Sequence, residues 1–355
     1  MMVVLRAMVT TVAFFAAATC HAVDARPNVL FIAVDDLRPA LGCYADPAAK
    51  TPNIDLLAER GVVLERAYCQ VPSCCPSRTA VLTGLRPAST GVDSNRSAHF
   101  RSKLPHCVTL PEYFKQHGYF CKELGKVFHR RDPVSWSEPK WIPQAAYAYP
   151  IYGTDAAIAR QKKARVTTKP EDWWGHSRWI KADSWEAPQV SGEELFDGQL
   201  ATKAIAELRR PHEKPWLLAL GFFRPHLPFI APQKYYDFFP EGKLALPLET
   251  GVPEGAPECS AHRSPEARSY PDSKRSGAIS AAKQRELLRG YYAAVSYVDV
   301  QIGRVLAELE KSGQDEKTIV VLWSDHGYQL GEQGIWGKAT NYEMSLRSTL
   351  IVAGP

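Results

Sequence analysis

The chain has 355 residues, of which 45% are hydrophobic and 23% are charged, a composition typical of soluble globular proteins. This length suffices for one large domain or two ordinary ones with a substantial core. The formal net charge of +5 is small and there is no long basic run, which argues against nucleic acid as a partner but suits an anionic small molecule or polyanion.

Residues 1–22 have the pattern of a secretory signal peptide. Arg6 supplies a positive charge, residues 8–18 form an apolar stretch, and Ala22 is a small residue at the expected cleavage point. The stretch is too short for a membrane-spanning helix. Cys20 leaves a lipoprotein as an alternative, but we expect export to a periplasmic, extracellular or lysosome-like compartment.

The first structural element that the sequence predicts is a buried strand. Residues 28–34 form a continuous apolar run, as expected of a central parallel strand covered on both faces. The run ends in Asp35 and Asp36, and two adjacent carboxylates repel each other unless a cation neutralises them. A metal site and a solvated Asp-Asp turn are the two interpretations. A short helix is predicted next, over residues 51–60.

Residues 72–84, Pro-Ser-Cys-Cys-Pro-Ser-Arg-Thr-Ala-Val-Leu-Thr-Gly, contain the motif C-x-P-S-R. Pro76 suits the first turn of a helix, where a missing N–H costs little. Cys74 would then lie just before the helix, near the free N–H groups that favour anions. The alternative is that Cys74 and Cys75 are a buried thiol and one half of a disulfide.

This segment resembles the signature of the sulfatase family, which belongs to the alkaline phosphatase superfamily. The resemblance implies that a formylglycine-generating enzyme oxidises Cys74 to Cα-formylglycine, which acts as a hydrated aldehyde. It also implies that Asp35 and Asp36 bind a divalent metal and that Arg78 steadies the hydrated aldehyde. Cys75 fills the variable position of the motif and should remain an ordinary cysteine.

The chain contains eight cysteines. Cys20 is expected to leave with the signal peptide, and Cys74 is assigned to chemistry. The even number that remains permits disulfides in an exported chain without specifying their pairing. Because no C-x-x-C pair is present, a structural zinc knuckle is not expected.

After a predicted helix at 110–117, residues 118–126 resemble the second sulfatase signature. The resemblance implies that Lys126 holds the sulfate and that His129 contacts the formylglycine hydroxyl. Without it, a surface lysine and a core histidine would be the ordinary interpretations. Cys121 stands where serine or threonine is usual.

Residues 130–195 show no clear periodicity, but tryptophans are interleaved with Lys and Arg there. A long loop of this kind is often functional, and its aromatic rings could bind sulfated sugars or pack on their own domain. These tryptophans are Trp136, Trp141, Trp173, Trp174, Trp179 and Trp185.

A predicted helix at 199–208 leads into a predicted strand at 216–222, which is followed by Arg-Pro-His-Leu-Pro-Phe at 224–229. This pattern, like Asp-Asp-Leu-Arg-Pro at 35–39, resembles the iduronate-2-sulfatase type. The resemblance implies that His226 contacts the sulfate. Residues 240–275 are rich in Pro, Ser, Glu and Arg and are predicted to be a surface loop.

The longest predicted helix spans residues 281–311, and its apolar spacing indicates one buried face. A second buried strand, residues 318–323, ends in Ser-Asp-His-Gly. Two parallel strands that end in polar residues bring those residues together at the carboxyl edge of the sheet. The resemblance implies that Asp325 and His326 complete the metal site with the modified Cys74, and that Lys338 bridges the sulfate and the leaving oxygen. A last strand is predicted from residue 348.

The resemblance implies an α/β fold of the sulfatase and alkaline phosphatase type, a large mixed sheet flanked by helices. Residues 23–355 would form the N-terminal catalytic domain. Family members continue further, so we expect the last sheet elements and the C-terminal subdomain to be absent, a C-terminally truncated form.

The implied activity is hydrolysis of a sulfate ester in a sulfated uronic acid or glycan, of the iduronate-2-sulfatase type. The implied metal is Ca²⁺, given the oxygen-rich ligand set, with Mg²⁺ as the second choice. Two alternatives remain: a phosphatase or phosphonate monoester hydrolase of the same superfamily, and an inactive secreted glycan-binding remnant.

Overall fold

A six-stranded mixed sheet forms the centre of the computed structural model, which describes residues 26–143, 152–165, 182–261, 266–273 and 277–355. The strand order is β2-β10-β7-β1-β5-β3. The strands are β1 (Asn28–Val34), β2 (Gly61–Val63), β3 (Phe120–Gly125), β5 (Trp216–Phe222), β7 (Thr318–Ser324) and β10 (Leu350–Ala353). β7, β1, β5 and β3 run parallel, whereas β10 is antiparallel to both β7 and β2.

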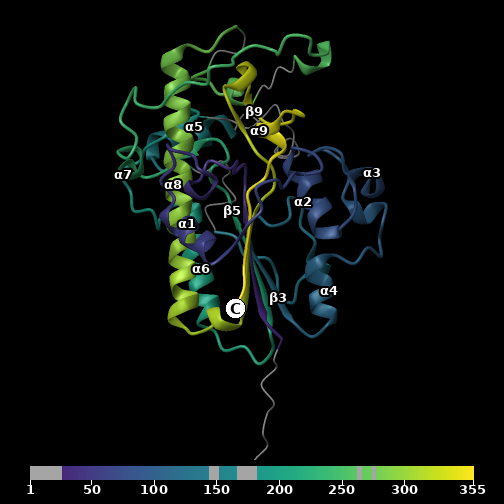
Figure 1. The fold of residues 1–355 in the computed structure, drawn as a ribbon. Coiled ribbons are helices and arrows are strands. Elements are labelled where there is room, and N and C mark those ends of the chain that lie inside the picture. Colours follow the sequence, from purple (N-terminus) through teal and green to yellow (C-terminus); the bar gives the residue numbers. More distant parts are fainter. Residues whose placement is uncertain (1–25, 144–151, 166–181, 262–265, 274–276) are drawn as a thin grey trace, which may run out of the picture.

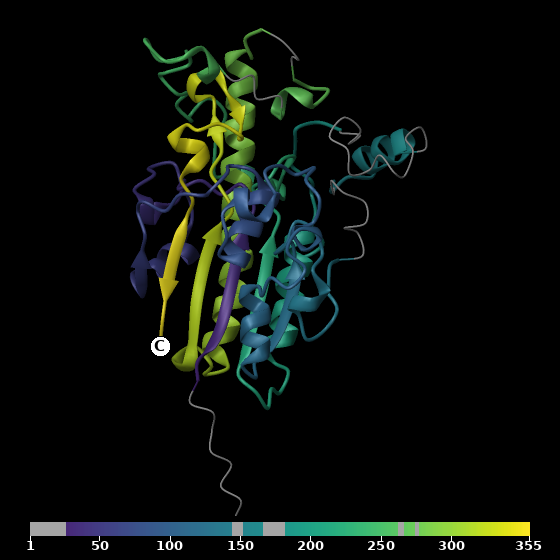
Figure 2. The same cartoon turned by 90° about the vertical axis from the view of Figure 1, so that its right-hand side faces the viewer.

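Helices cover both faces of this sheet, so the molecule has three layers (Figures 1 and 2). One face carries α1 (Pro52–Glu59), α6 (Phe196–Leu208) and the long α8 (Ala281–Lys311). The other face carries α2 (Cys74–Thr83) and α4 (Leu110–Gln116). Further helices are α3 (Pro87–Thr90), α5 (Asp155–Arg165), α7 (Gln233–Tyr236) and α9 (Glu343–Leu346). Two small sheets pair β4 (Trp185–Glu186) with β6 (Phe229–Ile230) and β8 (Gln329–Leu330) with β9 (Trp336–Gly337).

Alternate side chains of β1 enter two separate cores. Leu30 and Ile32 pack in the cluster that includes the buried face of α8, while Val29 and Phe31 pack in the cluster on the α2 side. A strand that is buried on both faces must be apolar at every position, which explains its continuous hydrophobic run. The predicted apolar stripe of α8 is confirmed, because its five members are completely buried: Val295, Val298, Ile302, Val305 and Leu309.

The predicted α/β fold with its flanked mixed sheet is confirmed, but two local predictions need correction. Residues 61–63 form an edge strand, β2, directly after the helix predicted over residues 51–60, where no strand was predicted. The surface-loop prediction for 240–275 is wrong near its end. There Ala267 and Tyr270 are buried within the α8 core, around a 3-10 turn at Ala267–Ser269.

Three of the six tryptophans in the long irregular segment lie within the described residues, and all three pack against other residues of the protein. Trp136 is buried, while Trp141 and Trp185 pack against the main core. Trp173, Trp174 and Trp179 lie outside the described residues, as does the proposed signal peptide at 1–22. Within the described residues every cysteine is a free thiol, and no helix is both long and apolar enough to cross a membrane.

Replacing Ile302 of α8 by alanine should test the packing of the long helix on the sheet. The side chain is completely buried, so we expect the change to lower the free energy of unfolding by about 2–5 kcal/mol. Urea denaturation followed by circular dichroism measures this loss. Glu310→Ala, at an exposed position of the same helix, is the matched control and should shift the free energy by less than about 0.5 kcal/mol. Equal urea midpoints for the two variants would contradict the burial of Ile302 between α8 and the sheet.

Candidate active site

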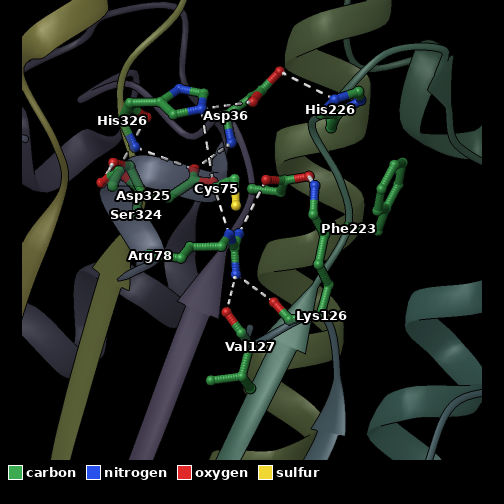
Figure 3. A network of polar contacts seen from close by, with 12 residues as sticks. Asp36, Cys75, Arg78, Lys126, Val127, Phe223, His226, Ser324, Asp325 and His326 are labelled. Atoms are coloured by element: carbon green, nitrogen blue, oxygen red, sulfur yellow. Dashed lines mark hydrogen bonds and ion pairs between the residues drawn. The ribbon is translucent and has the colours of Figure 1, made fainter. Parts of the chain in front are cut away.

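Polar residues gather at the carboxyl ends of the central strands (Figure 3). Asp35 and Asp36 follow β1, and Asp325 and His326 follow the neighbouring parallel strand β7. The register pairs Val34 with Ser324, so both polar pairs leave the sheet at the same level. The backbone N–H of Asp36 donates to Oδ1 of Asp325 at 3.1 Å. The structure thus brings the two acidic segments into one site.

Asp36 adopts a left-handed backbone conformation, with a φ of 61°. This conformation costs a non-glycine residue about 1 kcal/mol or more, so other contacts must hold it. One is the hydrogen bond to Asp325, and another comes from α8, where the hydroxyl of Tyr291 donates to the Asp36 carbonyl at 2.9 Å. The turn therefore directs the Asp36 carboxylate into the site.

Arg78 of α2 links the two acidic segments. Its Nε donates to Asp325 at 2.8 Å and a terminal nitrogen donates to Asp35 at 3.0 Å, and all three side chains are fully buried. The other terminal nitrogen donates to the carbonyls of Lys126 and Val127 (Figure 3). A buried charge must be paired and hydrogen-bonded, and this guanidinium satisfies both conditions.

Cys74 is the first residue of α2, where the sequence placed it just before the helix. Its side chain is buried at the end of the helix that carries unpaired N–H groups. The next N–H, of Cys75, donates to the side chain of Asn95 at 2.7 Å. Cys74 therefore presents its side chain toward the carboxylates from a fixed helix terminus.

Lys126 follows β3 and lies where β3 and β5 approach each other closely. A Cβ on Gly221 would lie 2.0 Å from the backbone of Lys126, so only glycine fits there. The Lys126 N–H donates to the Gly221 carbonyl at 2.8 Å, and its ammonium donates to Asp35. Its side chain remains 17% exposed, unlike the buried Asp35.

His226 lies in the loop that follows β5, and a buried carboxylate anchors this loop. Asp197 of α6 accepts hydrogen bonds from the N–H groups of Phe223 at 2.6 Å and Arg224 at 3.1 Å. Nδ1 of His226 lies 2.6 Å from the carbonyl of Leu227, which can only accept, so this nitrogen carries a proton. Nε2 of His226 then faces Asp36 at 4.0 Å.

His129 interacts electrostatically with the charge of Lys126. Its Nδ1 is buried and has no hydrogen-bond partner among the described residues. Burial, assisted by the charge of Lys126, lowers the pKa of His129 well below its ordinary value. His129 is therefore a neutral imidazole in this structure.

Lys338 reaches the site from the end of β9. The N–H of Ala339 donates to the carbonyl of Pro72 at 3.0 Å, which ties this segment to the one that carries Cys74. The Lys338 ammonium lies 2.6 Å from both carboxylate oxygens of Asp36 and 3.1 Å from Glu266. Apart from His129, for which no hydrogen bond or ion pair to the carboxylates is found among the described residues, the residues that the sequence proposed for this site lie around one group of carboxylates.

The two adjacent carboxylates of this site differ in their proton affinity. Burial alone would raise the pKa of Asp35, but the charges of Lys126 and Arg78 hold it well below its ordinary value. Burial raises the pKa of Asp36 well above its ordinary value despite the pairing with Lys338. The site therefore contains more negative charge than its own cations stabilise.

The residues present fit a divalent metal ion. Nδ1 of His326 lies 2.9 Å from the carbonyl of Gly327, so it donates there, and Nε2 is left as a lone-pair nitrogen. This Nε2 is buried, lacks a hydrogen-bond partner among the described residues, and faces Asp36 at 3.5 Å and Asp325 at 3.7 Å. Ligand atoms of Asp35, Asp36 and Cys74 lie within 4.8 Å of one another, and so do those of Cys74, Asp325 and His326.

Sequence reasoning missed two residues that the structure brings to this site. Glu266 belongs to the segment that was predicted to be a surface loop, yet it contacts Lys338 and His226. Asp197 lies just before the helix that was predicted at 199–208 and was not singled out, but it is part of α6 and anchors the His226 loop. Both contacts join segments that are distant in the sequence, so no local pattern could have indicated them.

Comparison with known proteins identifies related chains. The sequence model of the sulfatase family matches residues 27–355. A sulfatase of Formosa agariphila is 32% identical over 350 residues, covering 93% of this chain and 64% of that protein. Human iduronate 2-sulfatase is 32% identical over 344 residues, covering 92% of this chain and 60% of that protein. The chain thus spans about three fifths of the length of these relatives.

A solved structure supports the fold. The phosphonate monoester hydrolase of Agrobacterium radiobacter superimposes with a TM-score of 0.71 at 22% identity, covering 93% of this chain and 68% of the other. At this identity the likeness concerns the fold alone. The flanked mixed sheet is therefore a fold that this chain shares with a phosphonate monoester hydrolase.

Calcium should stabilise the protein more strongly at alkaline than at acidic pH. A raised folded-state pKa of Asp36 means that the proton bound there competes with a cation, so cation affinity rises as the pH rises. At a concentration a hundred times the dissociation constant, binding should add about 2.7 kcal/mol to stability. Thermal melts with and without Ca²⁺ at pH 5 and pH 8 measure the shift.

Two variants make the calcium experiment specific to this site. Asp36→Asn should lose the calcium-dependent shift in melting temperature, because it removes a negatively charged oxygen. Glu249→Gln, at an exposed position, should keep the shift. A shift of equal size in Asp36→Asn and the unaltered protein would place calcium elsewhere.

Proposed function

The chain belongs to the sulfatase family, and we propose that it hydrolyses sulfate esters of sulfated uronic acids or related sugars, as an enzyme of the iduronate-2-sulfatase type. The observation that carries this proposal is the position of Cys74. It lies at the N-terminus of α2, within 4.8 Å of two separate groups of carboxylate and imidazole ligands. A nucleophile that is bordered by cation ligands and ammonium groups suits attack on an anionic ester.

The charge balance of the site supports a sulfate ester over a phosphate ester. Four carboxylates (Asp35, Asp36, Asp325 and Glu266) face three cationic side chains (Arg78, Lys126 and Lys338). A divalent cation would leave about one net positive charge, which a singly charged sulfate ester neutralises. A phosphate monoester carries about −1.5 to −2 charges at neutral pH and fits less well.

Each residue of the site has a separate role in the proposed reaction. Lys126 and Lys338 would bind the sulfate oxygens, and His129 would accept a proton beside Lys126. Because Nδ1 of neutral His226 is engaged with a carbonyl, its Nε2 offers only a lone pair, so we assign the proton for the departing oxygen to the Lys338 ammonium. Arg78 would hold Asp35 and Asp325 in place throughout.

Two groups complete the proposed site. Asp35, Asp36, Asp325 and His326 would hold the metal, which we propose to be Ca²⁺ because the ligand set is rich in oxygen, and which would polarise the sulfate. We further propose that Cys74 is converted to Cα-formylglycine by a maturation enzyme. The hydrated aldehyde supplies one hydroxyl for attack on sulfur and another for the release of sulfate.

The sugar specificity rests on resemblance. The segments Asp-Asp-Leu-Arg-Pro and Arg-Pro-His support it, as does the 32% identity with human iduronate 2-sulfatase. Fold does not determine the substrate, and the structural likeness to a phosphonate monoester hydrolase supports one alternative. We also propose that residues 1–22 direct export and that residues 23–355 form a catalytic domain.

Replacing Cys74 by alanine tests the proposed nucleophile. Loss of a covalent nucleophile should lower kcat by about a thousandfold or more toward a sulfate ester. Mass spectrometry of the peptide that contains position 74 establishes conversion in the unaltered protein. Cys75→Ala is the matched control and should retain most of the activity. Full activity in Cys74→Ala, or an unaltered thiol in a fully active preparation, would contradict the proposal.

Matched esters separate the sulfatase from its alternatives. We expect kcat/KM to be about a hundredfold higher for 4-nitrophenyl sulfate than for 4-nitrophenyl phosphate. The reason is that the charge of the site matches the singly charged sulfate ester better than the more highly charged phosphate ester. A preference for the phosphate would favour the phosphatase alternative. If converted protein binds sulfated glycans but hydrolyses no ester, the glycan-binding remnant is favoured.

A further inference from the structure

Glu266 occupies the side of the site where the alcohol portion of a substrate would lie. Its Oε1 is 3.1 Å from the ammonium of Lys338 and 3.7 Å from Nε2 of His226. Lys338 is the proposed donor to the departing oxygen, and of the two carboxylates that contact its ammonium, Asp36 and Glu266, only Glu266 is not a proposed metal ligand.

Side-chain exposure separates the buried metal ligands from the margin of the site. The side chains of Asp36, Asp325 and His326 are completely buried, and that of Lys338 is 9% exposed. Glu266 at 21% and His226 at 17% are the more exposed members on the leaving-group side. Glu266 therefore lies at the partly exposed margin of the site.

The Glu266 carboxylate has unused capacity to accept hydrogen bonds. Oε1 pairs with Lys338, whereas Oε2 is buried and has no hydrogen-bond partner among the described residues. An ionised carboxylate offers about four lone-pair sites, and it accepts strong hydrogen bonds from hydroxyl groups. The Glu266 carboxylate therefore lacks a hydrogen-bond donor at Oε2.

We propose that Glu266 is a specificity-determining residue that accepts a hydrogen bond from the sugar hydroxyl next to the sulfate ester. That hydroxyl is the nearest donor that a sugar offers beyond the departing oxygen. A second anionic group at the same position would be repelled by the carboxylate. The favoured substrates are therefore sulfated sugars with a free hydroxyl beside the ester. This assignment rests on the proposed sulfatase function.

The segment around Glu266 is built to hold this side chain in place. Ala267 is completely buried and Tyr270 is 4% exposed, and both pack in the α8 core. The backbone closes a 3-10 turn at Ala267–Ser269, with the N–H of Tyr270 donating to the carbonyl of Ala267 at 3.2 Å. Glu266 is therefore presented by an anchored turn, as a residue that recognises substrate must be.

The test compares two ligands that differ at one hydroxyl. Unaltered protein with converted Cys74, Glu266→Ala and Glu266→Gln are assayed with a uronate 2-sulfate and with its analogue lacking the neighbouring hydroxyl. We expect Glu266→Ala to lower kcat/KM for the hydroxyl-bearing sugar at least tenfold more than for the deoxy analogue, with Gln intermediate. Glu254→Ala, at an exposed position of the same segment, serves as the control.

A binding measurement makes the test independent of turnover. The same two ligands are titrated calorimetrically into Cys74→Ala and into the double variant Cys74→Ala/Glu266→Ala. The preference for the hydroxyl-bearing ligand should be lost only in the double variant. If the Glu266 substitution lowers the affinity for both ligands equally, Glu266 only holds Lys338 in position. That result would overturn the proposal. If the unaltered protein hydrolyses neither sugar nor 4-nitrophenyl sulfate, the proposed function itself fails.

Discussion

The buried guanidinium of Arg78 is the contact on which the rest of the site depends. It joins Asp35 and Asp325, which follow the adjacent strands β1 and β7, and all three side chains are fully buried. Removing one partner of a buried ion pair costs about 3–5 kcal/mol, because the remaining charge is left uncompensated. Cys74 lies one helical turn before Arg78, so the same ion pairs fix the position of Cys74 relative to the carboxylates.

The same concentration of carboxylates creates the need for further positive charge. Arg78 and Lys126 stabilise Asp35 as an anion, but the pKa of Asp36 stays high because burial outweighs its pairing with Lys338. A cation bound by these carboxylates would take over the neutralising role and leave the Lys338 ammonium available to an anionic substrate. Under the proposed function, metal binding and substrate binding would therefore be linked through one lysine.

The parts that could be predicted from the sequence are those with a local pattern. The continuous apolar runs of β1 and β7 identified buried parallel strands, and parallel strands bring their carboxyl ends together, so Asp36 and His326 could be expected to meet. Glu266 could not be found in this way, because its partners Lys338 and His226 are distant in the sequence. The three-residue edge strand β2 was too short to produce a pattern, and only its pairing with β10 defines it.

The origin of each side chain suggests how chemistry and specificity are separated in this fold. The completely buried residues Asp35, Asp325 and Arg78 come from strand ends and from a helix, where packing on both faces of the sheet restricts any movement. His226 and Glu266 come from loops at the open side, each fixed by a separate anchor: Asp197 for the first and the buried turn beside Tyr270 for the second. A substitution at Glu266 leaves every contact of Arg78 intact. Under the proposed function, the recognised alcohol would therefore be able to change while the ion pairs of Arg78 stay the same.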